Sequence, residues 1–173
     1  MLGADAGEGP PLSMENEKRD GRMEKTRVLF ICTHNSARSQ MAEGLMNGLY
    51  GDRFQAFSAG TEATTVRPEA IQVMAEIGID ISSHRSKSID EFMDQRFDHV
   101  VMVCDNAARD CPFFPGGRNT IHHAFKDPAA CEGPEGEILD CFRLSRDDIR
   151  RWIEETFDVR GDGKSPGGPL LKS

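Results

Sequence analysis

The chain has 173 residues, of which 38% are hydrophobic, and this composition fits one ordinary globular domain with tails. Its formal net charge of -8 argues against a general nucleic-acid binder and against docking on an anionic lipid surface. No apolar run approaches the roughly 18 residues that a membrane-spanning helix requires.

The two ends of the chain are poor in the apolar residues that a packed core needs. Residues 1–25 are rich in Gly, Pro, Glu and Asp and lack the pattern of a secretory signal, so we expect a disordered extension, with Met14 or Met23 as alternative native starts. Residues 26–158 are expected to form the functional domain and residues 159–173 a flexible tail. Five cysteines without a signal predict a reducing compartment, the cytoplasm, where thiols are seldom paired.

Strands and helices alternate along this domain. Short apolar runs indicate strands, and apolar residues at helical spacing indicate helices, one of which has Pro68 in its first turn and Gly78 as its stop. The expected elements, in chain order, are a strand at Arg27–Cys32, a helix at Ser36–Tyr50, a strand at Phe54–Ala59, a helix at Arg67–Ile77, a short helix at Ser88–Asp94, strands at His99–Cys104 and Asn119–His122, and a helix at Glu135–Phe157. This alternation predicts an α/β fold, a three-layer sandwich whose four-stranded parallel sheet is covered on both faces.

A cysteine and an arginine with five residues between them follow the first strand. The intervening residues can turn their backbone N–H groups inward, and the next helix points its N-terminus at the same place, which favours a tetrahedral anion. Arg38 adds a planar guanidinium that can hold two oxygens of the anion. We expect this environment to lower the pKa of the Cys32 thiol well below its ordinary value, and Ser39 to donate a hydrogen bond to the sulfur. The predicted oxyanion-binding loop comprises Thr33, His34, Asn35, Ser36, Ala37 and Arg38.

An isolated pair with this spacing also has a plainer interpretation. A cysteine that closes a strand is often a small buried hydrophobe, and an arginine early in a helix is usually solvated. The order of strand, loop and helix favours the reaction site, as do the hydroxyl groups of Ser36 and Ser39.

A second pair of cysteines, Cys104 and Cys111, begins where the third strand ends. Because Cys32 and Cys104 both close strands of a parallel sheet, they are expected at the same edge. Along a continuous helix, residues seven apart are separated by about 10 Å, beyond the roughly 7 Å between Cα atoms that a disulfide allows. The pair can bridge only if the segment before Pro112 loops out. The residues alone leave open a redox switch or two unpaired cysteines.

Four segments, in order along the chain, are similar to segments of one protein family. Residues 27–157 resemble the thioredoxin-coupled arsenate reductases built on the low-molecular-weight tyrosine phosphatase fold. The matching segments are Cys32–Gly44, Ser58–Thr61, Gly78–Ser82 and Lys126–Ala129. The resemblance implies that fold, arsenate as substrate with phosphate or sulfate as analogues, thioredoxin as reductant, no cofactor and a monomer.

The resemblance also implies a relay of three thiols. The Cys32 thiolate attacks the arsenic of bound arsenate while Arg38 stabilises the oxyanion, and Asp127 protonates the departing oxygen. Cys104 then attacks Cys32, arsenite leaves with two electrons, and a disulfide between these two cysteines remains. Cys111 attacks Cys104 in turn, and thioredoxin reduces the resulting disulfide.

Some members of the family hold a potassium ion through residues that match Asn35, Glu43 and Ser58 and through a further carboxylate. Lys87 stands where that carboxylate is expected, so its ammonium group can replace the ion and pair with Glu43. We therefore expect no bound metal ion. The histidines show no zinc-type spacing beside cysteines, which argues against a structural zinc site.

Two other functions would use the same loop. A low-molecular-weight phosphatase would hydrolyse phosphoesters through a phosphocysteine on Cys32, with Arg38 and Asp127 but without the other relay thiols. Phosphotyrosine-specific relatives usually carry tyrosines after the Asp-Pro pair, whereas Ala129 and Ala130 follow it here, which argues against an aromatic phosphoester. A redox-responsive oxyanion sensor without turnover is the third interpretation.

The two remaining cysteines lie outside the relay. Cys131, in a loop of Gly, Pro and Glu, is expected to be an exposed thiol without function. Cys141, beside Phe142 on the last helix, is expected to contribute to packing. The histidines have no assigned partners, and His34 within the loop either tunes its electric field or faces solvent.

Overall fold

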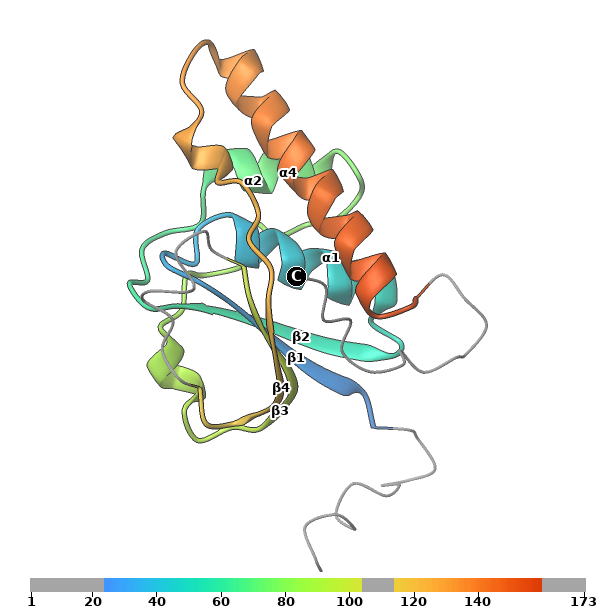
Figure 1. The fold of residues 1–173 in the computed structure, drawn as a ribbon. Coiled ribbons are helices and arrows are strands. Elements are labelled where there is room, and N and C mark those ends of the chain that lie inside the picture. Colours follow the sequence, from blue (N-terminus) through green and yellow to red (C-terminus); the bar gives the residue numbers. More distant parts are fainter. Residues whose placement is uncertain (1–23, 104–113, 160–173) are drawn as a thin grey trace, which may run out of the picture.

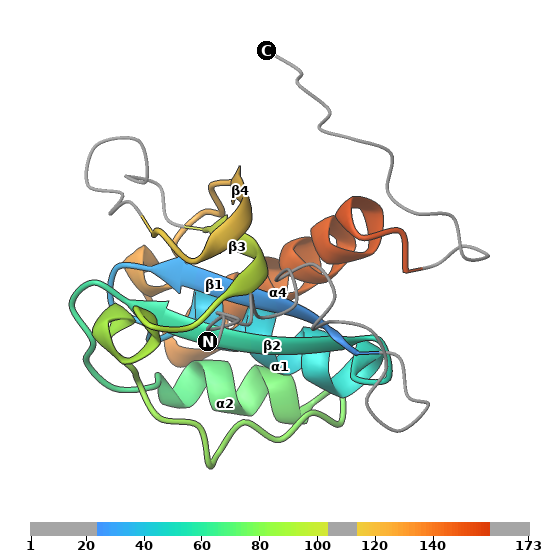
Figure 2. The same cartoon turned by 90° about the horizontal axis from the view of Figure 1, so that it is seen from below.

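One parallel sheet runs through the middle of the domain (Figures 1 and 2). The computed structural model describes residues 24–103 and 114–159, so Cys104 and Cys111 lie outside the described part. The strands are β1 (Thr26–Cys32), β2 (Phe54–Gly60), β3 (Phe97–Met102) and β4 (Gly117–His122). They are parallel throughout and follow the order β2-β1-β3-β4. The predicted α/β class with a four-stranded parallel sheet is confirmed.

Three α-helices pack together on one face of the sheet (Figure 1). The described helices are α1 (Arg38–Tyr50), α2 (Pro68–Ala75) and α4 (Glu135–Thr156), and there are two short 3-10 helices, η1 (Ile89–Phe92) and η2 (Pro128–Ala130). The helix η1 packs on the opposite face. Among the described helices, none combines the length and the apolar character needed to cross a membrane.

The central strand β1 is buried on both faces, which explains its continuous apolar sequence. Val28 and Phe30 face the α-helices, whereas Leu29 and Ile31 face the layer that contains η1. Burying each such side chain stabilises the fold by about 1.5–3 kcal/mol. This strand therefore holds its carboxyl end, where the predicted nucleophile lies, in a rigid position.

Most element boundaries differ by one or two residues from those predicted, and two of these differences have a clear structural cause. The strand β3 begins earlier, at Phe97, because its ring lies against those of Phe57 and Phe92, with centroids 5.6 and 6.0 Å apart. The helix α1 begins at Arg38 rather than at Ser36, because the preceding residues belong to the loop around the predicted nucleophile.

Candidate active site

Cys32 is the last residue of β1, and its side chain is buried at the carboxyl edge of the sheet. The sulfur lies 2.7 Å from Ser39 Oγ in a hydrogen bond, and the backbone N–H of Asn35 donates to the sulfur at 3.1 Å. Parallel α/β sheets bind their ligands at this edge. Three predicted site residues, Cys32, Asn35 and Ser39, are therefore in contact at the edge of the sheet where ligands are expected to bind.

The carbonyl groups of the loop are directed away from the sulfur. Four of these carbonyls accept hydrogen bonds of 2.8 to 3.3 Å from backbone N–H groups within residues 61–67. They belong to Cys32, Thr33, His34 and Ser36. Because a trans peptide unit points its C=O and N–H groups in opposite directions, outward carbonyls turn the N–H groups of the loop inward. This is the arrangement that an oxyanion-binding loop requires.

Asn35 supports the loop from within. Its φ of 49° lies in the left-handed region, which asparagine tolerates better than most residues, and its side chain is fully buried. Its Nδ2 group donates to Ser39 Oγ at 2.8 Å, and its Oδ1 accepts from Gln40 Nε2 and from the backbone N–H of Lys87, both at 2.8 Å. A Cβ on Gly60 would lie only 2.8 Å from the nitrogen of Asn35, so glycine is required beside the loop.

Burial raises the pKa of the Cys32 thiol above its ordinary value. The hydrogen bonds with Ser39 and Asn35 and the charge of Arg38 lower it, but they do not outweigh the burial. The predicted lowering of this pKa is therefore wrong. The prediction counted the positive surroundings of the sulfur but not its removal from water.

Arg38 and Asp127 are brought together by the fold. Arg38 Nη1 donates to the backbone carbonyl of Phe125 at 2.9 Å, and Arg38 Nη2 lies 3.6 Å from Asp127 Oδ2. Asp127 also begins η2, because its Oδ1 accepts a hydrogen bond from the N–H of Ala129 at 3.0 Å. The predicted guanidinium and the predicted acid thus meet, although they come from the start of α1 and from the segment after β4.

The residues at the predicted ion position form an ion pair. Lys87 Nζ lies 3.3 Å from Glu43 Oε2 and 3.5 Å from Ser58 Oγ, and the Ser58 hydroxyl donates to the same carboxylate. The Lys87 and Glu43 side chains are only 13% and 12% exposed, so water screens their attraction less than on an open surface. The backbone N–H of Lys87 reaches Asn35, which connects the ion pair to the loop.

Two supporting residues were missed in the sequence, Gln40 and His84. Gln40 Nε2 donates to Asn35 Oδ1 at 2.8 Å and to the carbonyl of Arg85 at 2.9 Å, while His84 Nδ1 lies 3.0 Å from Gln40 Oε1. Burial lowers the pKa of His84, although the nearby Glu43 carboxylate acts to raise it. Gln40 lies inside the first family segment, but no spacing pattern marks either residue as a support.

The expectations for the last two cysteines are wrong, because Cys131 and Cys141 form a disulfide with 6.6 Å between their Cα atoms. Residues 132–134 connect η2 to α4 and bring the end of η2 beside the second turn of that helix. The prediction that these two cysteines stay unpaired rested on the absence of a secretory signal, which indicates a reducing compartment where disulfides are rare. Among the described cysteines, Cys32 is a free thiol. The relay roles of Cys104 and Cys111 stay predictions, since both lie outside the described residues.

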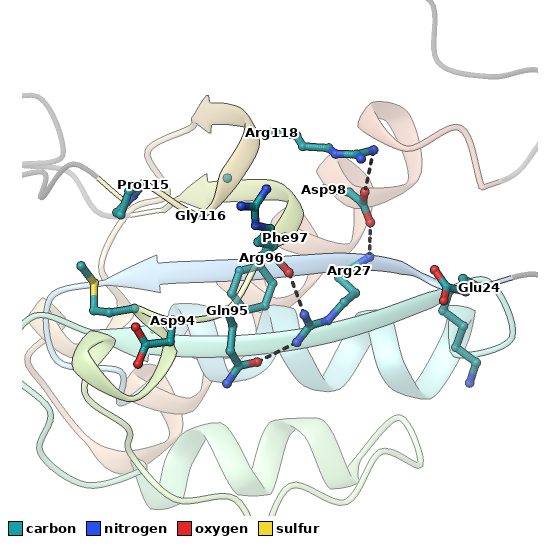
Figure 3. A pocket seen from close by; sticks show the side chains of 13 residues that line it. Glu24, Arg27, Asp94, Gln95, Arg96, Phe97, Asp98, Pro115, Gly116 and Arg118 are labelled. Atoms are coloured by element: carbon teal, nitrogen blue, oxygen red, sulfur yellow. Dashed lines mark hydrogen bonds and ion pairs between the residues drawn. The ribbon is translucent and has the colours of Figure 1, made fainter. Parts of the chain in front are cut away.

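A hollow of about 540 Å³ lies at the edge of the sheet opposite Cys32, around the amino ends of β1, β3 and β4 (Figure 3). The Arg27 guanidinium donates there to the carbonyl of Arg96 and to Gln95 Oε1, both at 2.7 Å. Arg118 pairs with Asp98 at 3.7 Å. Of the predicted site residues that the structure describes, none lines this hollow.

Comparison with known proteins assigns the chain to a family. Residues 27–158 match the sequence profile described as low molecular weight phosphotyrosine protein phosphatase. The chain belongs to this family, whose fold it shares.

Within the family, the chain is similar to arsenate reductases. The arsenate reductase of Halalkalibacterium halodurans is 45% identical over 139 residues, which cover 80% of this chain and 99% of the relative. The structure of an arsenate reductase in the phosphate binding state has a TM-score of 0.61 at 34% identity and covers 75% of this chain and 95% of its own. The structure of the thioredoxin-dependent arsenate reductase of Corynebacterium glutamicum has a TM-score of 0.54 at 26% identity. The match covers 76% of this chain and 61% of that chain. The resemblance seen in the sequence is therefore confirmed.

Proposed function

We propose that this protein reduces arsenate to arsenite with electrons from a dithiol protein of the thioredoxin class. The observation that carries the proposal is the Cys32 sulfur within a loop of inward N–H groups, with Arg38 and Asp127 joined beside it. Relatives named arsenate reductase, among them two at 45% and 41% identity, support it. We place this activity in the cytoplasm and in a monomer.

In the proposed first step, the loop binds arsenate and the Cys32 sulfur attacks the arsenic. The N–H groups and the Arg38 guanidinium stabilise the negative charge of the transition state. A sulfur–arsenic bond forms as an arsenic–oxygen bond breaks, and Asp127 gives a proton to the departing oxygen, which leaves as water. The proton that the thiol loses balances the one that Asp127 gives.

The proposed relay then moves electrons away from the arsenic. Cys104 attacks the Cys32 sulfur, the electron pair of the sulfur–arsenic bond stays on arsenic, and arsenic(V) leaves as arsenite. Cys111 next attacks Cys104 and frees Cys32, and an external dithiol reduces the resulting disulfide. This part of the proposal rests on the sequence resemblance and is supported by a structural neighbour that is a thioredoxin-dependent arsenate reductase.

We further propose that Lys87 takes the place of a potassium ion in supporting the loop. Its ammonium group lies among the oxygens of Glu43 and Ser58, and its backbone N–H holds Asn35. An ammonium supplies one positive charge to the same oxygens that would surround the ion. The loop should therefore keep its shape without added potassium.

Phosphoester hydrolysis is the second candidate, favoured by membership of the phosphatase family. It would use Cys32, Arg38 and Asp127 through a phosphocysteine that water hydrolyses. The segment after the acid offers the small side chains of Ala129 and Ala130 in place of aromatic walls. This composition favours a small inorganic oxyanion as substrate.

The test compares wild type with Cys111→Ser in arsenate-dependent oxidation of NADPH, with thioredoxin and thioredoxin reductase present. We expect sustained turnover by the wild type, at most one turnover by the variant, and none by Cys32→Ser. Glutaredoxin with glutathione, in a parallel assay, identifies the preferred donor. A wild type that is inactive here but hydrolyses p-nitrophenyl phosphate as well as Cys111→Ser does would establish the phosphatase instead.

A further inference from the structure

The Cys131–Cys141 disulfide is attached directly to the segment that carries the proposed acid. Asp127 Oδ1 accepts from the N–H of Ala129 at 3.0 Å, the Asp127 carbonyl accepts from Ala130 at 3.3 Å, and the Pro128 carbonyl accepts from the N–H of Cys131 at 3.2 Å. Residues 127–131 therefore form one hydrogen-bonded unit, which we call the acid turn. A covalent restraint on Cys131 reaches the carboxylate through this unit.

The other end of the disulfide is anchored in the core. Cys141 lies on α4 next to Phe142, which has no exposed surface, and near Leu139, which is 8% exposed. By contrast, residues 132–134, which connect Cys131 to the start of α4, are exposed, and they include Gly133 at a φ of 131°. Glycine at such a φ gives the connection little resistance to movement. The disulfide thus adds a covalent tie to the packing of η2, whose Pro128 is buried, against the anchored helix.

We propose that Cys131 and Cys141 form a second dithiol–disulfide couple, distinct from the relay, which fixes the acid turn when oxidised and releases it when reduced. The inference rests on the proposed function for its catalytic consequence. Neither cysteine is fully buried, which is a condition for the approach of a dithiol protein. The substrate class of this second site is a protein dithiol such as the one that drives the relay.

The exchange reaction balances. A thiolate of the dithiol attacks one sulfur of the Cys131–Cys141 bond, and a mixed disulfide forms as the other cysteine leaves as a thiolate and takes a proton. The second thiol of the reductant then attacks the mixed disulfide. The reductant ends as a disulfide after losing two electrons and two protons, and both cysteines end as thiols. An oxidised dithiol protein reverses the reaction.

Release of the acid turn should weaken proton donation without preventing anion binding. The reduced turn would keep its contact with Arg38, at 3.6 Å from Asp127 Oδ2, but would lose its covalent tie to α4 and be held to that helix by the packing of η2 alone. A positioned general acid contributes about 10²–10⁴-fold to rate. Partial loss of that positioning should lower kcat about three- to tenfold, with little change in KM.

The test measures amide hydrogen exchange by mass spectrometry on the full chain, with and without dithiothreitol. We expect a peptide covering the acid turn to exchange at least about tenfold faster after reduction, while a peptide from β1 is unchanged. Cys141→Ser should show the fast exchange under both conditions, and Cys131→Ser should match it. These variants also separate this couple from the relay cysteines, which dithiothreitol reduces as well.

Two results would overturn the inference. One is an acid turn that exchanges at the same rate in the oxidised and reduced wild type. The other is a response to dithiothreitol that persists in Cys141→Ser. The wild-type comparison needs no variant to fold. A change in exchange without any arsenate turnover would refute the proposed function but not the couple, whereas turnover without such a change would refute only the couple.

Discussion

The two halves of the candidate site are held by different kinds of contact. Around Cys32, the hydrogen bonds to Asn35 and Ser39 join residues at most seven positions apart. The acid turn is instead held by the disulfide to α4 and by Arg38, which lies 3.6 Å from Asp127 and bonds the carbonyl of Phe125 just before the turn, across 87 positions. The hydrogen bonds that reach the sulfur itself are therefore local, although tertiary contacts support the loop from outside, whereas the position of the acid depends on tertiary contacts directly. Variants in the two halves should consequently fail in different ways.

The largest expected effect is a loss of kcat when Asp127, the proposed acid, can no longer donate a proton. Asp127→Asn keeps the shape of the side chain but removes the proton, so kcat for arsenate reduction should fall about 10²–10³-fold. Steady-state assays with excess thioredoxin measure this, and phosphate binding by calorimetry should change little. Asp52→Asn, on an exposed residue in the turn after α1, is the matched control and should behave as wild type. If Asp127→Asn keeps the full kcat of the wild type, Asp127 is not the general acid of the reaction.

The next effect is on stability and concerns the Cys32 loop. Asn35→Ala leaves the backbone N–H of Lys87 without its partner, removes one of two hydrogen bonds of the Ser39 hydroxyl, and places alanine at positive φ. The free energy of unfolding should fall by about 2–3 kcal/mol, as measured by urea denaturation.

Asn47→Ala is the control for this comparison. Its exposed side chain also makes two hydrogen bonds, with the backbone of Ala56 at 2.8 and 2.9 Å, but at an ordinary helical position of α1. Its cost should be about 1 kcal/mol. Equal costs for the two variants would contradict a special support role for Asn35.

A smaller effect follows from the raised pKa of Cys32. Above the ordinary thiol pKa of about 8.5, the unfolded chain releases this proton while the folded protein keeps it. Stability from this group is thus complete below that pH and is lost as the pH rises toward the raised pKa. The loss should be about 1.4 kcal/mol per pH unit. Urea denaturation of wild type and Cys32→Ala between about pH 7 and pH 9.5 tests it, and parallel curves would refute the burial effect.

The smallest expected effect is the response of the wild type to potassium. If the Lys87 ammonium supports the loop, kcat/KM should agree within about twofold in potassium and sodium buffers, because no ion binds to the folded state. Lys87→Gln leaves Glu43 without its cation, so its activity should fall and potassium should partly restore it. A wild type that requires potassium would reject the replacement.

Much of the fold and part of the site could be predicted from local patterns. The apolar run of β1 is readable because a strand buried on both faces shows no alternation. The contact between Cys32 and Ser39 is readable because the strand, the loop and the first turn of α1 are consecutive. Gln40 and His84 could not be recognised as supports, since their partners lie in a segment that only folding brings near.

The sequence by itself determined the α/β class, the family and the residues of the Cys32 loop, because these depend on the order of neighbouring residues along the chain. The pairing of Lys87 with Glu43 also follows from the sequence, through the resemblance to the family, and the structure shows it. Only the tertiary structure decided two further features. It paired Cys131 with Cys141, and it buried the Cys32 sulfur deeply enough to raise its pKa. Each of these depends on distances and on access to water, which are set when segments far apart in the chain pack together.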